Sequence, residues 1–79
     1  MDSVSTPMAK FYLHVRRGNT IWEDRHGVDV DGADGAVEKA RQYGREILRD
    51  EPEMSAQLQW IEIEDEAGAI VRKVPFGFL

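Results

Sequence analysis

The sequence contains no cysteine, so neither a disulfide bond nor a thiolate zinc site can stabilise it. It also has no apolar run approaching the roughly 18 residues that a membrane-spanning helix needs. The opening residues, MDSVSTP, lack the basic and apolar regions of a secretory signal, and we expect a cytoplasmic protein. Their small, polar composition predicts a disordered tail at residues 1–7, followed by a single small domain at residues 8–79.

Acidic residues outnumber basic ones, and the two kinds are unevenly distributed along the chain. The net charge is −5, and seven acids without a single base lie between Asp50 and Glu66. General nucleic-acid binding depends on neutralising phosphates, so this balance argues weakly against it. A local basic strip remains open, because Arg41, Arg45 and Arg49 recur every four residues on one exposed helix face. This row is the candidate phosphate-contact face of an alternative function, a nucleic-acid-linked regulator that resembles small antitoxin domains only in its topology.

The motifs that carry common catalytic chemistries are missing. Neither a GxGxxG loop nor a GK[ST] phosphate loop occurs, and the serines lie outside any nucleophile-elbow context. The acidic segment at residues 29–34 fails as a calcium loop, since Ala33 and Ala40 would occupy ligand positions. We therefore predict no catalytic site, no cofactor, no metal and no enzymatic activity.

Histidine chemistry is the remaining catalytic alternative, and it ranks last. The only histidines are His14 and His26. His26 lies in a predicted turn and is most simply a solvated residue. If Glu62 or Glu64 lies beside His14, the pair has the composition of an acid–base site. The competing interpretation, which we favour, is a polar histidine on an exposed or interface-facing sheet.

One strong helical period runs from Asp31 to Asp50. We expect Asp31 or Asp34 to cap its first turn, and Gly44 to mark close packing against a neighbouring element. Pro52 prevents much continuation. The residues of the apolar stripe recur at steps of three and four and are Ala33, Ala36, Val37, Ala40, Gly44, Ile47 and Leu48.

The remaining segments alternate between apolar and polar residues, as half-buried strands do. The predicted fold class is α+β, with two antiparallel β-hairpins joined by one α-helix (ββαββ) and the helix packed on one face of a four-stranded sheet. The predicted strands are residues 10–16, 20–23, 58–64 and 70–74, and residues 28–30 form a short extended piece before the helix.

The register of the first hairpin stays open. A three-residue loop places Trp22 beside His14, whereas a two-residue loop places it beside Leu13 or Val15. In the second hairpin, a bulge at the glycine turn predicts that Glu62 lies opposite Arg72.

One helix covers only one face of a sheet, so the other face is the leading functional candidate. Aromatic and arginine side chains are enriched at interface hot spots, and exposed apolar patches mark interfaces. We predict a non-enzymatic interaction module, a homodimer that self-associates through this open face or through an edge strand, without contact to membranes. The competing possibility is that residues 76–79 cover the patch. The candidate interaction face comprises Tyr12, His14, Arg16, Trp60, Glu62 and Glu64, with Trp22 added in one register.

Several short motifs together resemble a widespread family of short bacterial proteins of unknown function. The motifs are F-x-x-H-V-R-x-G from Phe11, D-x-x-G from Asp24, A-R at Ala40, W-x-E-I-x-D-E-x-G from Trp60 and V-P-F from Val74. The resemblance covers nearly everything from Met8 onward and departs at Arg17, where an acid is more usual. It implies the two-hairpin fold and a bacterial cytoplasmic setting, and it implies no activity.

Overall fold

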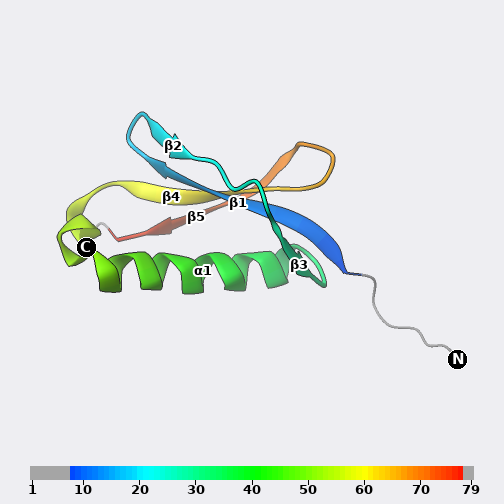
Figure 1. The fold of residues 1–79 in the computed structure, drawn as a ribbon, viewed down its shortest axis with the longest axis horizontal. Helices are drawn as coiled ribbons and strands as arrows, with labels where there is room; N and C mark the ends of the chain where they lie inside the picture. Colours follow the sequence, from blue (N-terminus) through cyan, green and yellow to red (C-terminus); the bar gives the residue numbers. More distant parts are fainter. Residues whose placement is uncertain (1–7, 78–79) are drawn as a thin grey trace, which may run out of the picture.

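The computed structural model describes residues 8–77, and every structural statement below concerns that part of the chain. The predicted disordered tail at residues 1–7 lies outside it, as do residues 78–79. The elements in chain order are β1 (Ala9–Arg17), β2 (Thr20–Trp22), β3 (Val28–Val30), α1 (Ala33–Asp50), the 3₁₀ helix η1 (Pro52–Ala56), β4 (Gln59–Glu64) and β5 (Ile70–Phe76) (Figure 1).

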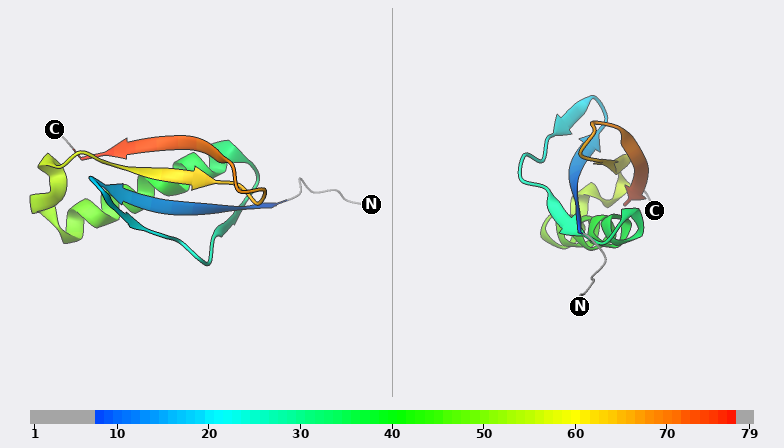
Figure 2. Two further views of the ribbon diagram at one scale, coloured as in Figure 1. Left: turned by 90° about the horizontal axis from the view of Figure 1, so that it is seen from above. Right: turned by 90° about the vertical axis from the view of Figure 1, so that its right-hand side faces the viewer.

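The sheet is antiparallel, with the strand order β2-β1-β4-β5. Helix α1 runs along one face of this sheet, and the opposite face carries no other described helix or strand (Figure 2, left). The prediction of an α+β fold with one helix on one face is therefore confirmed. The strand number is corrected to five, because β3 also pairs with β1. Strand β1 is nine residues long and β2 pairs with only its end, which leaves the first part of the same edge to β3.

The first hairpin has a two-residue loop, Gly18-Asn19, and this decides its register. Trp22 pairs with Val15 and so shares its side of the sheet, the side of the helix. The alternative register, in which a three-residue loop places Trp22 beside His14, is therefore wrong. Gly18 has a φ of 59°, which a tight hairpin loop requires and glycine adopts readily.

The second hairpin contains a register shift between Ile63 and Glu64. Glu62 lies opposite Lys73, so the predicted pairing of Glu62 with Arg72 is wrong by one residue. Strand β5 continues through Pro75 to Phe76, which is possible because β5 is an edge strand and a missing N–H there breaks no ladder.

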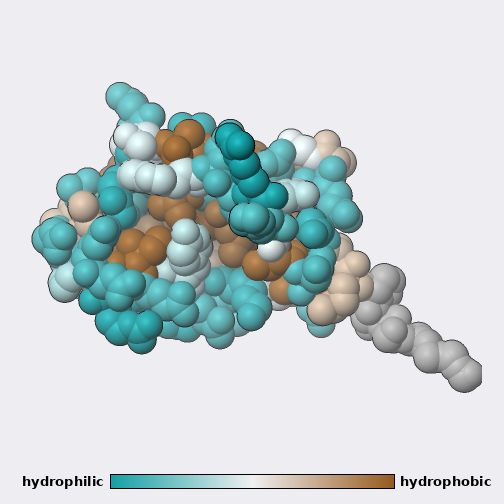
Figure 3. All heavy atoms as spheres, viewed as in Figure 1, coloured by the Kyte–Doolittle hydropathy of each residue, from teal (hydrophilic) through white to brown (hydrophobic). Residues whose placement is uncertain are grey.

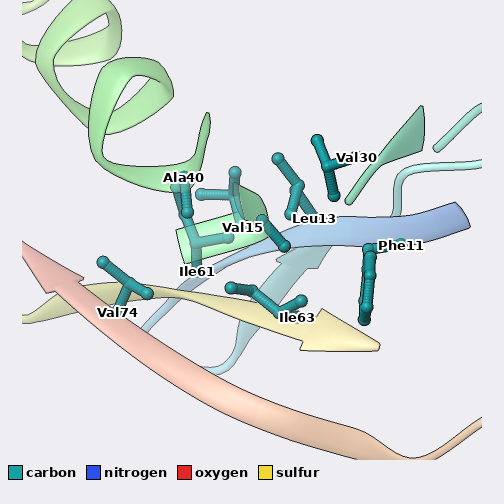
Figure 4. Packing of buried hydrophobic residues seen from close by; sticks show 9 residues of the cluster. Phe11, Leu13, Val15, Val30, Ala40, Ile61, Ile63 and Val74 are labelled. Atoms are coloured by element: carbon teal, nitrogen blue, oxygen red, sulfur yellow. The ribbon is translucent and has the colours of Figure 1, made fainter. Parts of the chain in front are cut away.

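The core lies between the sheet and α1, and Figure 4 shows its packing. Ala36 and Ala40 are fully buried, and their small side chains let the helix approach Ile61 and Ile63 closely. The buried apolar residues are Phe11, Leu13, Val15, Val30, Ala36, Ala40, Ile61, Ile63 and Val74.

The helix begins two residues later than the sequence pattern predicts. Its N-cap is Gly32, which provides no side-chain hydrogen bond, so the expected capping by Asp31 or Asp34 is wrong. The close packing expected at Gly44 is confirmed. A Cβ built on this residue would lie 2.9 Å from Cβ and Cγ of Phe76. Phe76 therefore packs on the helix side and does not cover the open face.

Candidate functional site

The open sheet face brings together all six residues of the candidate interaction face. Strand β1 supplies Tyr12, His14 and Arg16, and β4 supplies their cross-strand partners. The resulting pairs are Tyr12 with Glu64, His14 with Glu62, and Arg16 with Trp60. Alternation along both strands sends these side chains away from α1, because their neighbours Leu13, Val15, Ile61 and Ile63 form the core.

His14 is fixed by hydrogen bonds at both ring nitrogens. Its Nδ1 accepts the backbone N–H of Asp24 at 3.0 Å, and its Nε2 lies 2.6 Å from Oε1 of Glu64. A backbone N–H can only donate, so Nδ1 carries no proton and Nε2 donates to the carboxylate. His14 is only 8% exposed, and its ring stacks against Tyr12, with 6.5 Å between centroids. Both ring nitrogens are therefore hydrogen-bonded within the chain.

Asp24 connects the loop between β2 and β3 to strand β1 through hydrogen bonds. Sequence patterns did not reveal this role. Its carboxylate accepts the backbone N–H groups of Leu13 at 3.1 Å, His26 at 2.9 Å and Gly27 at 3.0 Å. Burial raises the pKa of this carboxyl, but the three N–H donors outweigh it and hold the pKa below the ordinary value. The sequence indicated only a turn at this position.

Glu62 is a buried acid of the open face, at 8% exposure. Its Oε2 accepts the indole N–H of Trp60 at 3.1 Å and lies 3.4 Å from Nε of Arg16. The Arg16 contact is an ion pair by distance but lacks hydrogen-bond geometry, since Nε makes no hydrogen bond. Burial raises the pKa of Glu62. Trp60, Arg16 and Lys73 together lower it by more, so the net shift is downward.

An apolar row crosses the open face at the end near the C-terminus of α1. Ile21 pairs with Arg16, Arg16 with Trp60, and Trp60 with Pro75, so the row reaches four of the five strands, β2, β1, β4 and β5. Ile21 is 38% exposed, and Leu58, two residues before Trp60, is 60% exposed. We call Ile21, Leu58, Trp60 and Pro75 the apolar row. Of these residues, only Trp60 was expected on the open face from the sequence, because the positions of Ile21 and Pro75 follow from strand register.

The arginine row does not join this face. Arg41, Arg45 and Arg49 are all exposed along α1. Nη1 of Arg41 lies 3.5 Å from Oε1 of Glu38, one turn earlier on the helix. The exposed acid Glu46 lies between Arg45 and Arg49 in the sequence and further reduces the local positive charge.

Residues 8–77 contain neither a metal-ligand cluster nor a membrane-spanning helix. No three acidic or histidine side chains there converge closely enough to ligate a metal ion. Within the same residues, α1 is too polar to cross a lipid bilayer.

The geometry defines a class of small α+β protein in which a single helix covers one sheet face and a hydrogen-bonded polar and aromatic network lines the other. Residues 10–77 match the family described as a domain of unknown function (DUF6894), and the chain belongs to that family. This agrees with the predicted resemblance to a family without an assigned activity. No curated protein and no solved structure matches the chain.

Proposed function

We propose that the protein is a non-enzymatic interaction module that self-associates as a homodimer through its open sheet face. The observation that carries the proposal is the apolar row, which crosses four of the five strands on a face without a covering element in residues 8–77. Apolar side chains grouped on one surface of a small domain are typical of an interface. Trp60 and Arg16 at its centre are residue types that dominate interface energies.

The polar groups beside the apolar row favour association rather than oppose it. Glu62 and His14 are already hydrogen-bonded within the chain, so a second copy would not leave them unpaired. Burial of an unpaired charge is the usual penalty at such an interface. Occupation of both nitrogens of His14 also supports a non-enzymatic role, because a general base needs a free nitrogen near its substrate.

The face supports association better than either sheet edge does. Strand β2 has only three residues, which is too short for extensive pairing with another chain. Strand β5 carries Arg72, Lys73 and Pro75, and charged residues and proline on an edge discourage strand addition. We therefore assign the dimer contact to the face.

Replacing Ile21 with lysine is expected to weaken the dimer at least tenfold, because a charge would be buried without a partner at the apolar row. Ile21 is exposed, so the monomer should keep its fold. Sedimentation equilibrium at micromolar concentration measures the effect. Tyr43→Lys is the matched control, since Tyr43 is 40% exposed but lies on α1. A monomeric wild-type protein, or equal dissociation by both variants, would contradict the proposal.

The alternative proposal is a nucleic-acid-linked regulator, and the exposure of Arg41, Arg45 and Arg49 on one helix is what favours it. It predicts that binding of a mixed-sequence duplex weakens with salt, with a slope of about −0.9 per contacted phosphate. Changing all three arginines to glutamate should abolish that binding in fluorescence anisotropy, while Ile21→Lys leaves it intact. Absence of binding at low salt removes this alternative.

A further inference from the structure

A second surface follows the seam between one flank of α1 and the edge formed by β2, β3 and their connecting loop. Three hollows lie along it, of about 600, 300 and 430 Å³. The first and second share Trp22 and Tyr43, and the first and third share Lys39 and Gln42. Shared walls make the three hollows one continuous surface, which we call the seam groove.

The seam groove gathers apolar side chains that the core does not use. Three of the six large apolar residues that are exposed within residues 8–77 line it: Met8 at 62%, Trp22 at 49% and Tyr43 at 40%. Leu13 and Val15, both buried, line its inner side. Figure 3 shows apolar atoms in the recess between the helix below and the strands above. Apolar walls of this kind contact a ligand by side-chain burial.

The length of the seam groove fits an extended chain. Its helix wall runs from Gly35 to Asp50. At 1.5 Å per residue this wall is roughly 22 Å long. An extended peptide rises about 3.3 Å per residue, so about seven residues would span it. A small molecule would occupy only one of the three hollows.

The charge of the seam groove selects a basic occupant. Eight acidic side chains line it against three basic ones. Two of the basic residues already face acids, since Arg17 lies 3.7 Å from Glu51 and Arg25 lies 4.0 Å from Glu23. The acidic residues are Glu23, Asp24, Asp29, Asp31, Glu38, Glu46, Asp50 and Glu51.

Trp22 is already in contact with a basic side chain of the same chain. The guanidinium carbon of Arg17 lies 5.1 Å from the centroid of the indole ring, within the range of a cation–π interaction. Tyr43 lines the same hollows with a second aromatic ring. Aromatic rings beside acids are the chemistry that recognises lysine and arginine.

We propose that the seam groove binds an extended, basic segment of a partner protein. Apolar side chains of the segment insert beside Trp22 and Tyr43, and its lysine or arginine side chains face the acidic rim. Binding uses side-chain contacts rather than strand addition, because the loop at residues 23–27 interrupts the edge between β2 and β3. The proposal is independent of the homodimer, which uses the opposite side of the sheet.

Fluorescence anisotropy with a labelled peptide tests the proposed binding. The peptide has about eight residues, with two leucines at alternate positions and lysines at the others. We expect saturable binding, and at least tenfold weaker binding of the same peptide with glutamate in place of lysine. Trp22→Ala and Tyr43→Ala should each weaken binding about tenfold. Arg45→Ala is the matched control on α1 and should have no effect, because Arg45 does not line the groove.

A second readout uses intrinsic fluorescence. The chain has two tryptophans, so Trp22 is the only one in a Trp60→Phe variant. Its emission should shift when the lysine peptide is added. Equal binding of the lysine and glutamate peptides would overturn the proposal. So would binding that survives both aromatic substitutions, or equally tight competition by free lysine amide, which would indicate a site for a small cation. Ile21→Lys should keep peptide binding, so the two proposals fail separately.

Discussion

Asp24→Ala is expected to lower the free energy of unfolding by about 3 to 4 kcal/mol, because three backbone N–H groups lose a charged acceptor at once. The donors belong to Leu13, His26 and Gly27, so the variant also releases the loop between β2 and β3. A domain of this size has a total stability on the order of 4 to 12 kcal/mol, so the loss is a large share of it. Urea unfolding followed by tryptophan fluorescence measures the change.

Asp65→Ala is the matched control for this substitution. Oδ1 of Asp65 also accepts two backbone N–H groups, from Ala67 and Ala69, but in an exposed turn. Water replaces a lost acceptor there, so we expect a cost of about 1 kcal/mol. If Asp24→Ala destabilises the protein no more than Asp65→Ala does, the assigned role of Asp24 is wrong.

The wild-type protein and Asp24→Ala should also differ in how their stability depends on pH. The pKa of Asp24 in the folded protein lies below its ordinary value of 3.8, so the ionised carboxylate stabilises the fold. This stabilisation is complete above the ordinary value and is lost as the pH falls through the lower folded-state pKa. Wild-type stability should therefore fall more steeply than that of Asp24→Ala in this acidic window. Glu62 shifts in the same direction and contributes equally to both curves.

Gly44→Val is expected to destabilise the protein by about 2 to 3 kcal/mol through overpacking. The Cβ alone would lie 2.9 Å from Cβ and Cγ of Phe76, atoms close to the β5 backbone that cannot swing aside. Thermal and urea unfolding of the variant measure the loss.

Gly44→Ala separates packing from helix propensity. On an exposed helix this change would add about 1 kcal/mol of stability. Here we expect a net loss, because the added methyl group meets Phe76. Combining Gly44→Ala with Phe76→Ala should remove the clash, so the two changes should cost less together than the sum of their single effects. A stabilised Gly44→Ala protein would show that β5 shifts freely away from α1.

Local periodicity predicted the elements because it depends on neighbouring residues. The four-residue recurrence around Ala36 and Ala40 identified the helix, and alternation identified β1 and β4. The same alternation separated Leu13 from His14 and so defined the open face. Register depends on loop geometry, so the sequence did not decide on which face of the sheet Trp22 lies. The two-residue loop places it beside Val15.

The sequence by itself determined the fold class, the helix, the two hairpins and the six residues of the open face, because side-chain period is a local property. Only the tertiary structure decided which partners those residues meet. Glu64 reaches His14 across 50 positions, and Asp24 reaches Leu13 across 11. The seam groove arises in the same way, since Trp22 and Tyr43 become neighbours only when α1 packs beside the β2 edge. Contacts between distant segments depend on how elements pack, and no local pattern encodes them.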